Sequence, residues 1–183
     1  GEPSYEDIPY GLHRSDEPYW KDYEIRRYAY WSVFAGGCGF TYGHNAVMQF
    51  YMPGDSGTSY FPKVNWKEGL NAPGAGQMKY LTKLILSKSY FDRVPAQELI
   101  VGNGERYDKV LATKGKDYAM FYIYNSGQFN VSIDKLKFIP KKASWYNPRN
   151  GQTVDINKSK YKLTESFDPP GEQQNGNDWV LIL

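Results

Sequence analysis

The chain has 183 residues and a formal net charge of +2, with 22 basic and 20 acidic residues interspersed along it. No basic run is longer than Lys141-Lys142, which excludes the charge pattern of a nucleic-acid-binding protein, and no window of about 18 apolar residues predicts a membrane-spanning helix. Aromatic residues make up 17% of the chain, and 17 residues are tyrosines. Tyrosine joins an apolar face to a polar tip, so this richness is typical of sugar-binding clefts and also of β-sandwich surfaces.

The chain contains one cysteine, Cys38, which cannot form a disulfide within the chain and lacks the neighbours of a metal site. Its apolar surroundings in the sequence predict a small buried residue. Neither His13 nor His44 stands at metal-ligand spacing from another ligand, so the sequence predicts no metal and no cofactor. A single cysteine is compatible with a cytoplasmic or a bacterial periplasmic location.

Two carboxylates, Glu2 and Glu6, stand at the beginning of the sequence beside a proline and a tyrosine. Glycoside hydrolysis requires a pair of carboxyl groups, one as acid and the other as base or nucleophile. The alternative is two solvated acids near a chain end, and spacing alone favours this alternative. Because no strand precedes Gly1 in the sequence, we expect most of the scaffold of such a site to lie outside this chain.

The next segment alternates helical periodicity with glycine-rich turns. Asp22 is predicted to cap a helix that Gly36-Gly37 ends, and Pro73 is predicted to lie in the first turn of a later helix. Between them, the apolar run 38–42 is bounded by glycines and predicts one buried strand. One strand between two helices cannot form a sheet, so residues 1–94 are predicted to be part of a larger βα-repeat fold.

Polar side chains occur at the end of this predicted strand, in Tyr42-Gly43-His44-Asn45. Barrel enzymes place functional side chains at the corresponding strand ends, so His44 is a candidate for hydrogen bonding or proton transfer. The alternative, a loop histidine that is hydrogen-bonded by its neighbours, is equally compatible with the pattern.

The second half of the chain, residues 95–183, has the pattern of a small antiparallel β-sandwich. The continuous apolar run 118–124 is predicted to be a central strand, and Ser126-Gly127 and Asn150-Gly151 are predicted to be hairpin turns. The expected strands are 99–101, 110–113, 118–125, 128–133, 143–146, 153–156, 161–163 and 179–183.

The exposure of two tryptophans in this half would distinguish a packing role of the domain from a sugar-binding role. Trp179 opens the apolar run 179–183 and is expected in the core. The face of Trp145 is undecided by the alternation around it, and an exposed Trp145 would offer a stacking platform for a sugar ring.

Several segments resemble the apiosidase-like glycoside hydrolases. Gly1–Glu6 resembles their seventh-strand motif, and similar segments follow at 23–31, at 39–45 and at 73–78. The second half resembles the domain that usually follows, which is named for collagen binding in collagenases. Its matching segments are 112–120, 143–151 and 177–183.

The resemblance implies the last quarter of a (β/α)8 barrel over residues 1–94, followed by the β-sandwich over 95–183. It implies a catalytic carboxylate at the end of strand seven, with Glu2 as first choice and Glu6 as second. Tyr5, Tyr42 and His44 are expected to contact the sugar. The acid/base partner is expected in the remaining barrel residues, so this segment alone is expected to be inactive.

These expectations together predict a bacterial glycoside hydrolase, periplasmic, cell-surface or secreted, that acts on an oligo- or polysaccharide. Apiose-containing pectin is the substrate class that the family name implies. The rival hypothesis is a non-catalytic carbohydrate-binding or structural β-sandwich module within residues 95–183.

Overall fold

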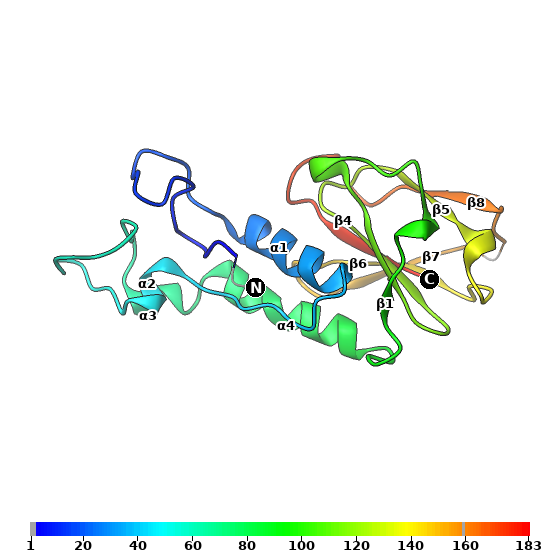
Figure 1. Ribbon diagram of the computed structural model, residues 1–183, viewed down its shortest axis with the longest axis horizontal. Coiled ribbons are helices and arrows are strands. Elements are labelled where there is room, and N and C mark those ends of the chain that lie inside the picture. The colour runs from blue at the N-terminus through cyan, green and yellow to red at the C-terminus, as the bar shows by residue number, and fades with distance from the viewer. Residues whose placement is uncertain (1–2, 159) are drawn as a thin grey trace. The chain divides into compact units, whose positions relative to one another are not determined.

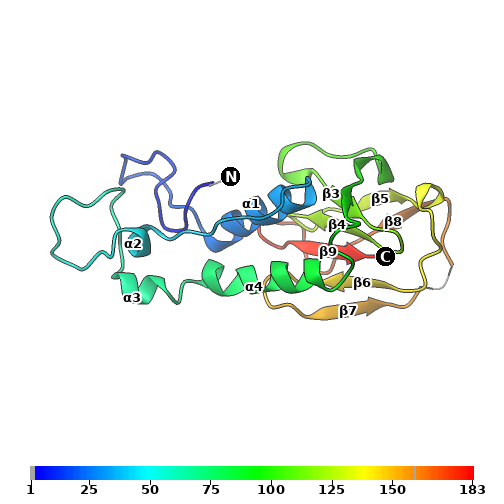
Figure 2. The same cartoon turned by 60° about the horizontal axis from the view of Figure 1, so that its bottom comes forward.

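The computed structural model describes residues 3–158 and 160–183 (Figure 1). They form two units, one of which contains Gly39–Lys79 and the chain up to Ala29, and the other Tyr30–Cys38 and Tyr80–Leu183. The division falls inside helices α1 (Asp22–Phe34) and α4 (Pro73–Leu86), which run side by side (Figure 2). The described residues mix α and β structure, and the strands of their sheets pair antiparallel.

Helix α1 begins at Asp22 and is followed by Gly36, whose φ of 104° lies in the left-handed region that favours glycine. The helix therefore starts and ends close to its predicted limits, but Asp22 is its first helical residue and not its cap. Ile25 and Ala29 are fully buried. Acidic residues occupy the first turn, where their negative charge interacts favourably with the positive end of the helix dipole.

Helix α4 begins at Pro73, as predicted, because proline has the φ of a first turn and needs no donor there. The short helices α2 (Asn45–Met48) and α3 (Trp66–Gly69) precede it. Asn65 caps α3 by accepting a hydrogen bond from the N–H of Glu68 at 3.0 Å. His44 caps α2 in the same way, through its imidazole ring.

The prediction of a strand at 38–42 is wrong, because the structure describes these residues and assigns them no helix or strand. An isolated parallel bridge pairs Glu6 with His44 just beyond them. A strand needs a neighbouring backbone along its length to form a ladder, and the pairing described here spans a single residue pair. Cys38 is exposed and not buried as expected, because it follows the Gly36-Gly37 turn and lies outside any sheet.

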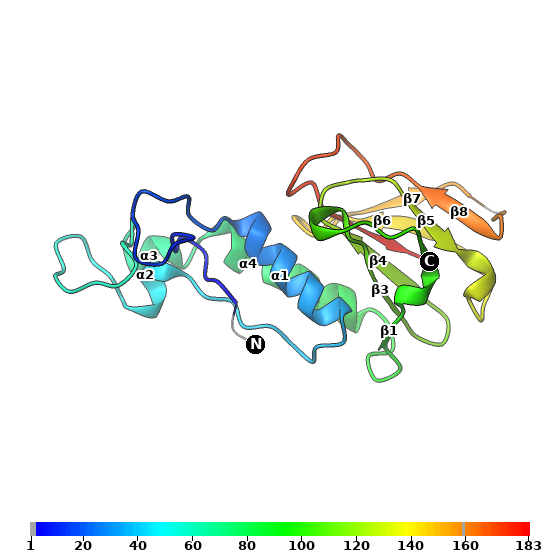
Figure 3. The same ribbon diagram turned by 45° about the horizontal axis from the view of Figure 1, so that its top comes forward.

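The described residues of the second unit form two antiparallel sheets. Figure 2 shows β9 between β4 and β6 with β7 beyond, and Figure 3 shows β5 and β8 together. The larger sheet has the order β1 (Val94–Pro95), β3 (Leu111–Lys114), β4 (Ala119–Ile123), β9 (Trp179–Ile182), β6 (Ala143–Tyr146) and β7 (Thr153–Ile156). The smaller sheet has the order β2 (Ile100–Val101), β5 (Phe129–Ser132) and β8 (Thr164–Phe167). Short 3-10 helices cover Gln97–Leu99, Arg106–Asp108 and Ile133–Lys135.

Strand β4 confirms the predicted central strand, since it pairs with β3 and β9 and all its residues are buried. One face of β4 contributes Phe121 and Ile123 to the hydrophobic core. On the other face, the ring of Tyr122 stacks on Tyr30 of α1 with centroids 4.8 Å apart. Both faces are covered, which explains why the strand is continuously apolar.

The two predicted hairpins have different outcomes. Asn150-Gly151 does connect the paired strands β6 and β7, with Gly151 at φ 73°. Ser126-Gly127 does not form a hairpin, because β4 and β5 belong to different sheets. Ser126 adopts a φ of 57°, and the Asn125 side chain accepts a hydrogen bond from the Gly127 N–H at 3.1 Å, so this turn passes the chain between sheets. The strand expected at 161–163 begins later, at Thr164.

Candidate active site

A cavity of about 530 Å³ lies within the first unit, next to the Glu6–His44 bridge. Its wall combines acidic, basic and aromatic side chains. These are Glu6, Asp7, Asp22 and Glu68, then Lys21, Lys63 and His44, then Tyr19 and Trp20. This mixture of ionisable groups with aromatic rings is suited to a ligand that offers both hydroxyl groups and apolar faces.

Glu6 is held by both its backbone and its side chain. Its N–H donates to the Gly43 carbonyl at 2.9 Å, and its own carbonyl accepts from the Asn45 N–H at 2.9 Å. Its Oε2 accepts from the Tyr42 hydroxyl at 2.6 Å and from the Gly74 N–H at 3.1 Å. The pKa of Glu6 is nevertheless raised above its ordinary value, because burial of the carboxylate outweighs these two hydrogen bonds.

His44 faces Glu6 across the bridge and is itself buried. Its Nδ1 accepts a hydrogen bond from the Ala46 N–H at 3.2 Å, so the neutral ring carries its proton on Nε2. Burial lowers the pKa of His44, and the nearby Asp7 carboxylate opposes this shift. A neutral imidazole with a fixed tautomer can donate a hydrogen bond to a ligand in the cavity.

Glycines make room for three of the candidate side chains. A Cβ on Gly43 would lie 2.5 Å from the ring of Tyr5, and one on Gly69 would lie 2.8 Å from Nδ1 of His44. A Cβ on Gly74 would overlap Oε2 of Glu6. Each glycine lets the backbone pass close to one of these side chains, which restricts the rotation of that side chain.

Asp22 reaches the cavity from the start of α1, where the sequence predicted only a helix cap. Its Oδ2 accepts hydrogen bonds from Arg26 Nη1 at 3.2 Å and from Gln77 Nε2 at 2.9 Å. Arg26 Nη1 also donates to Gln77 Oε1 at 2.6 Å. This buried network ties α1 to α4 behind the cavity and compensates the Asp22 charge.

Lys63 enters the cavity wall from the loop that precedes α3. Its ammonium group lies 3.2 Å from the ring centroid of Tyr19, a cation–π contact. Neither residue was singled out in the sequence, because a lysine in a long loop and a tyrosine in an irregular segment have no local pattern that marks them.

The structure brings together Glu6, Tyr42 and His44, which the sequence proposed from different segments. Tyr5 lies beside Gly43 in the same group. Glu2, the first choice for the catalytic carboxylate, lies outside the described residues. Asp7, directly after Glu6, was missed: its left-handed φ of 63° and its place on the cavity wall are tertiary features.

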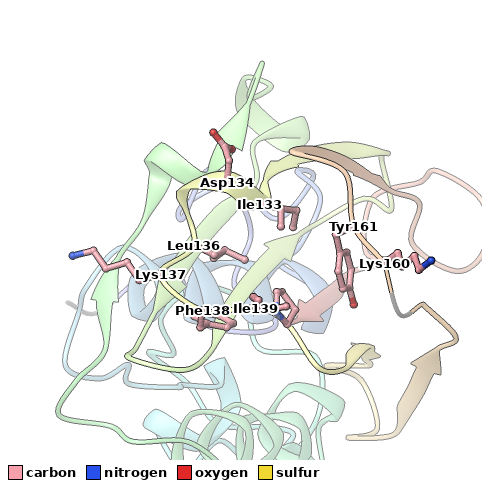
Figure 4. Close-up of a pocket in the computed structure, with 9 residues that line it drawn as sticks. Ile133, Asp134, Leu136, Lys137, Phe138, Ile139, Lys160 and Tyr161 are labelled. Carbon is pink, nitrogen blue, oxygen red and sulfur yellow. The ribbon is translucent and has the colours of Figure 1, made fainter.

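The second unit has a separate cavity of about 730 Å³ (Figure 4). Its lining is mainly apolar, with Ile133, Leu136, Phe138 and Ile139 facing Tyr161, while Lys137 points away from it. Trp145 is 4% exposed and Trp179 is 7% exposed, and both belong to the core between the sheets. Trp145 therefore provides no exposed stacking surface.

Among residues 3–158 and 160–183, no group of three or more His, Cys, Asp or Glu side chains is arranged to hold a metal ion. Within the same residues, every helix is too short or too polar to cross a bilayer.

The chain matches two family profiles end to end. Residues 1–92 match "Apiosidase-like, catalytic domain", and residues 94–183 match "Putative collagen-binding domain of a collagenase". No curated protein matches the chain.

Solved structures match over the whole chain. One, named "Glycoside hydrolase", is 47% identical with a TM-score of 0.91, and the match covers 100% of this chain and 41% of that one. Another is the 1.90 Å crystal structure of a glycoside hydrolase family 5 protein from Bacteroides vulgatus ATCC 8482, which is 44% identical with a TM-score of 0.92. That match covers 99% of this chain and 40% of that one, so this chain spans about two fifths of the length of both proteins.

The cavity with its buried carboxylate, the matched profiles and these structures lead to one family. The chain belongs to the apiosidase-like glycoside hydrolases, with an apiosidase-like catalytic-domain segment followed by a domain of the collagen-binding type.

Proposed function

We propose that this chain is the C-terminal part of an enzyme that cleaves glycosidic bonds, and that its first unit forms one side of the active site. The observation that carries the proposal is the isolated Glu6–His44 bridge, which pairs the segments on either side of helix α1 in parallel. Parallel pairing of two segments joined through a helix is typical of the repeating unit of a (β/α)8 barrel, where catalytic residues lie at the carboxyl ends of strands.

Glu2 is the proposed catalytic carboxylate at the end of strand seven, and Glu6 is the second candidate. In the retaining route the carboxylate attacks the sugar, and a second carboxyl group about 5 Å away protonates the leaving oxygen. In the inverting route the two groups are about 6.5–9.5 Å apart and a water molecule attacks. The partner would come from barrel residues outside this chain, so this segment alone would be inactive.

Tyr5, Tyr42 and His44 are the proposed sugar contacts in this unit. His44 would donate through Nε2–H, since its Nδ1 is already occupied by the Ala46 N–H. Tyr42 supports Glu6 directly through its hydroxyl group. Apiose-containing pectin is the proposed substrate, by the family's name, and a bacterial periplasmic, cell-surface or secreted location would bring the enzyme to it.

The test compares Glu2→Gln with Glu6→Gln in the complete protein, with sugar release from apiose-containing pectin fragments as the readout. Loss of a catalytic carboxylate should lower kcat by roughly 10³-fold or more. We expect this loss for Glu2→Gln and a smaller one for Glu6→Gln. The reverse order would transfer the catalytic role to Glu6, and wild-type turnover in both variants would end the assignment.

For the second unit, the buried Trp145 favours the structural alternative over glycan binding on a tryptophan platform. We propose that residues 95–183 have no separate catalytic role. Nothing in the described contacts of this unit indicates collagen as a ligand.

A further inference from the structure

We infer that Asp7 binds hydroxyl groups of a neutral sugar unit in the cavity and so helps to determine specificity. This inference rests on the proposed glycoside hydrolase function. It concerns a residue that the sequence pattern did not single out.

The backbone of Asp7 is fixed on both sides. Its N–H donates to the Trp20 carbonyl at 2.9 Å, and its carbonyl accepts from Asn45 Nδ2 at 2.7 Å. The residue adopts a φ of 63°, in the left-handed region that residues other than glycine rarely enter. These constraints fix the direction in which the side chain leaves the backbone, and Asp7 lies on the cavity wall.

Asp7 is partly buried, and its Oδ2 is buried with no hydrogen-bond donor in the described part of the chain. Aspartate is tolerated in the left-handed region mainly because its short side chain can hydrogen-bond locally, but no such bond forms here. A buried carboxylate oxygen without a donor is unfavourable, so the site gains from a ligand that donates a hydrogen bond to Asp7.

The charges around the cavity identify the class of donor. Asp7 shares the wall with Glu6, Asp22 and Glu68, against the cations Lys21 and Lys63. A uronic acid would bring another carboxylate into these surroundings and would be repelled. A neutral sugar instead offers hydroxyl donors to Asp7.

The other groups on the wall suit the same ligand. His44 offers Nε2–H to a sugar oxygen, and the rings of Tyr19 and Trp20 offer surface to the apolar face of the ring. A carboxylate acceptor, an imidazole donor and aromatic surface together match a hydroxyl-bearing ring without charge.

The experiment replaces Asp7 with Asn and with Gly in the complete enzyme. Asn keeps the shape but exchanges one acceptor oxygen for a donor, and Gly removes the side chain while suiting the left-handed backbone. Leu12→Gly is the matched control, because Leu12 also has a positive φ, of 54°, but is exposed and lies off the cavity wall. Steady-state kinetics on a neutral oligosaccharide and on its single-deoxy analogues are measured, together with thermal unfolding.

We expect both Asp7 variants to lower kcat/KM by roughly 10- to 100-fold, mainly through KM, while Leu12→Gly stays near wild type. The loss should disappear on the analogue that lacks the hydroxyl bound by Asp7. Asp7→Asn should also weaken the preference for neutral inhibitors over the corresponding uronic acids.

Folded Asp7 variants with kcat/KM within about twofold of wild type would overturn the inference while leaving the hydrolase function intact. Tighter inhibition of the wild type by uronic acids than by neutral sugars would also overturn it. A wild-type enzyme that cleaves no glycoside would instead refute the proposed function. If Asp7→Asn fails to fold, Asp7→Gly decides, since its backbone is compatible with the observed φ.

Discussion

At the scale of single residues, Glu6 illustrates how burial and hydrogen bonding compete. Its carboxylate accepts two hydrogen bonds, from Tyr42 and from Gly74, and both favour the ionised form. Burial favours the protonated form and prevails, so the pKa of Glu6 is raised. An acid on the wall of a cavity whose pKa is raised in this way is a candidate for proton transfer.

The raised pKa predicts how stability depends on pH. The ordinary pKa of this group is 4.5, and the folded value is higher. Below pH 4.5 the carboxyl is protonated in both states, so ionisation costs nothing. As pH rises through the folded pKa, the unfolded chain has already lost its proton and the folded protein loses stability. Wild type should therefore become less stable relative to Glu6→Gln across this window.

Denaturant unfolding of wild type and Glu6→Gln at a series of pH values measures the difference in their free energies of unfolding. Titrating groups that both proteins share contribute equally to the two values and cancel in this difference. Tyr42→Phe serves as a second probe. It removes a hydrogen bond that lowers the pKa of Glu6, so the upper end of the window should move to higher pH. A stability difference that does not change with pH would contradict the prediction.

At the scale of elements, the start of α4 is shaped by the site. Gly74 is buried in the first turn of α4 and lies against Glu6 and Tyr42. Gly76 lies two residues further along the same helix, is exposed, and has no atom within 4 Å of the position that a Cβ would take. Glycine is a poor helix former, so its presence at both positions has a cost. At Gly74 the close approach of the Glu6 carboxylate explains the choice.

We predict opposite effects of alanine at these two positions. Gly74→Ala should destabilise the protein by about 1–3 kcal/mol, because the new methyl group overlaps Glu6 Oε2. Gly76→Ala should stabilise it by about 0.5–1 kcal/mol through helix propensity alone. Urea unfolding compares the two variants, and equal effects of the same sign would show that Glu6 does not restrict this turn.

Several elements could be predicted from local pattern, because their causes are local. The helix starting at Asp22, the helix starting at Pro73 and the turn at Asn150-Gly151 each depend on residues within a few positions. The predicted hairpin at Ser126-Gly127 failed because strand pairing is decided by distant residues: β4 pairs with β9, over fifty residues later.

At the scale of the whole molecule, the second unit depends on a core between its two sheets. Trp145 from β6 and Phe129 from β5 meet there, with ring centroids 6.1 Å apart. The large aromatic side chains of both sheets thus contribute to packing, which explains much of the aromatic richness that the composition alone left open between packing and sugar binding.

Trp145→Ala should destabilise the protein by about 3–5 kcal/mol, because it leaves a large cavity between the sheets. Phe91→Ala is the matched control, since Phe91 is an aromatic residue of the same unit but is 96% exposed. Its effect should stay within about 0.5 kcal/mol. Chemical denaturation followed by circular dichroism gives both values, and similar losses in the two variants would contradict a core role for Trp145.

The sequence by itself determined the family resemblance, the helix limits and the all-β character of the second half, because these depend on motifs, caps and alternation along the chain. It also pointed to Glu6, Tyr42 and His44, but as separate candidates. Only the tertiary structure decided that Tyr42 and His44 both lie next to Glu6, that Trp145 is buried and that Cys38 is exposed. The same holds for Asp7, because the charge and hydrogen bonding of a side chain depend on segments that the fold brings together from distant positions.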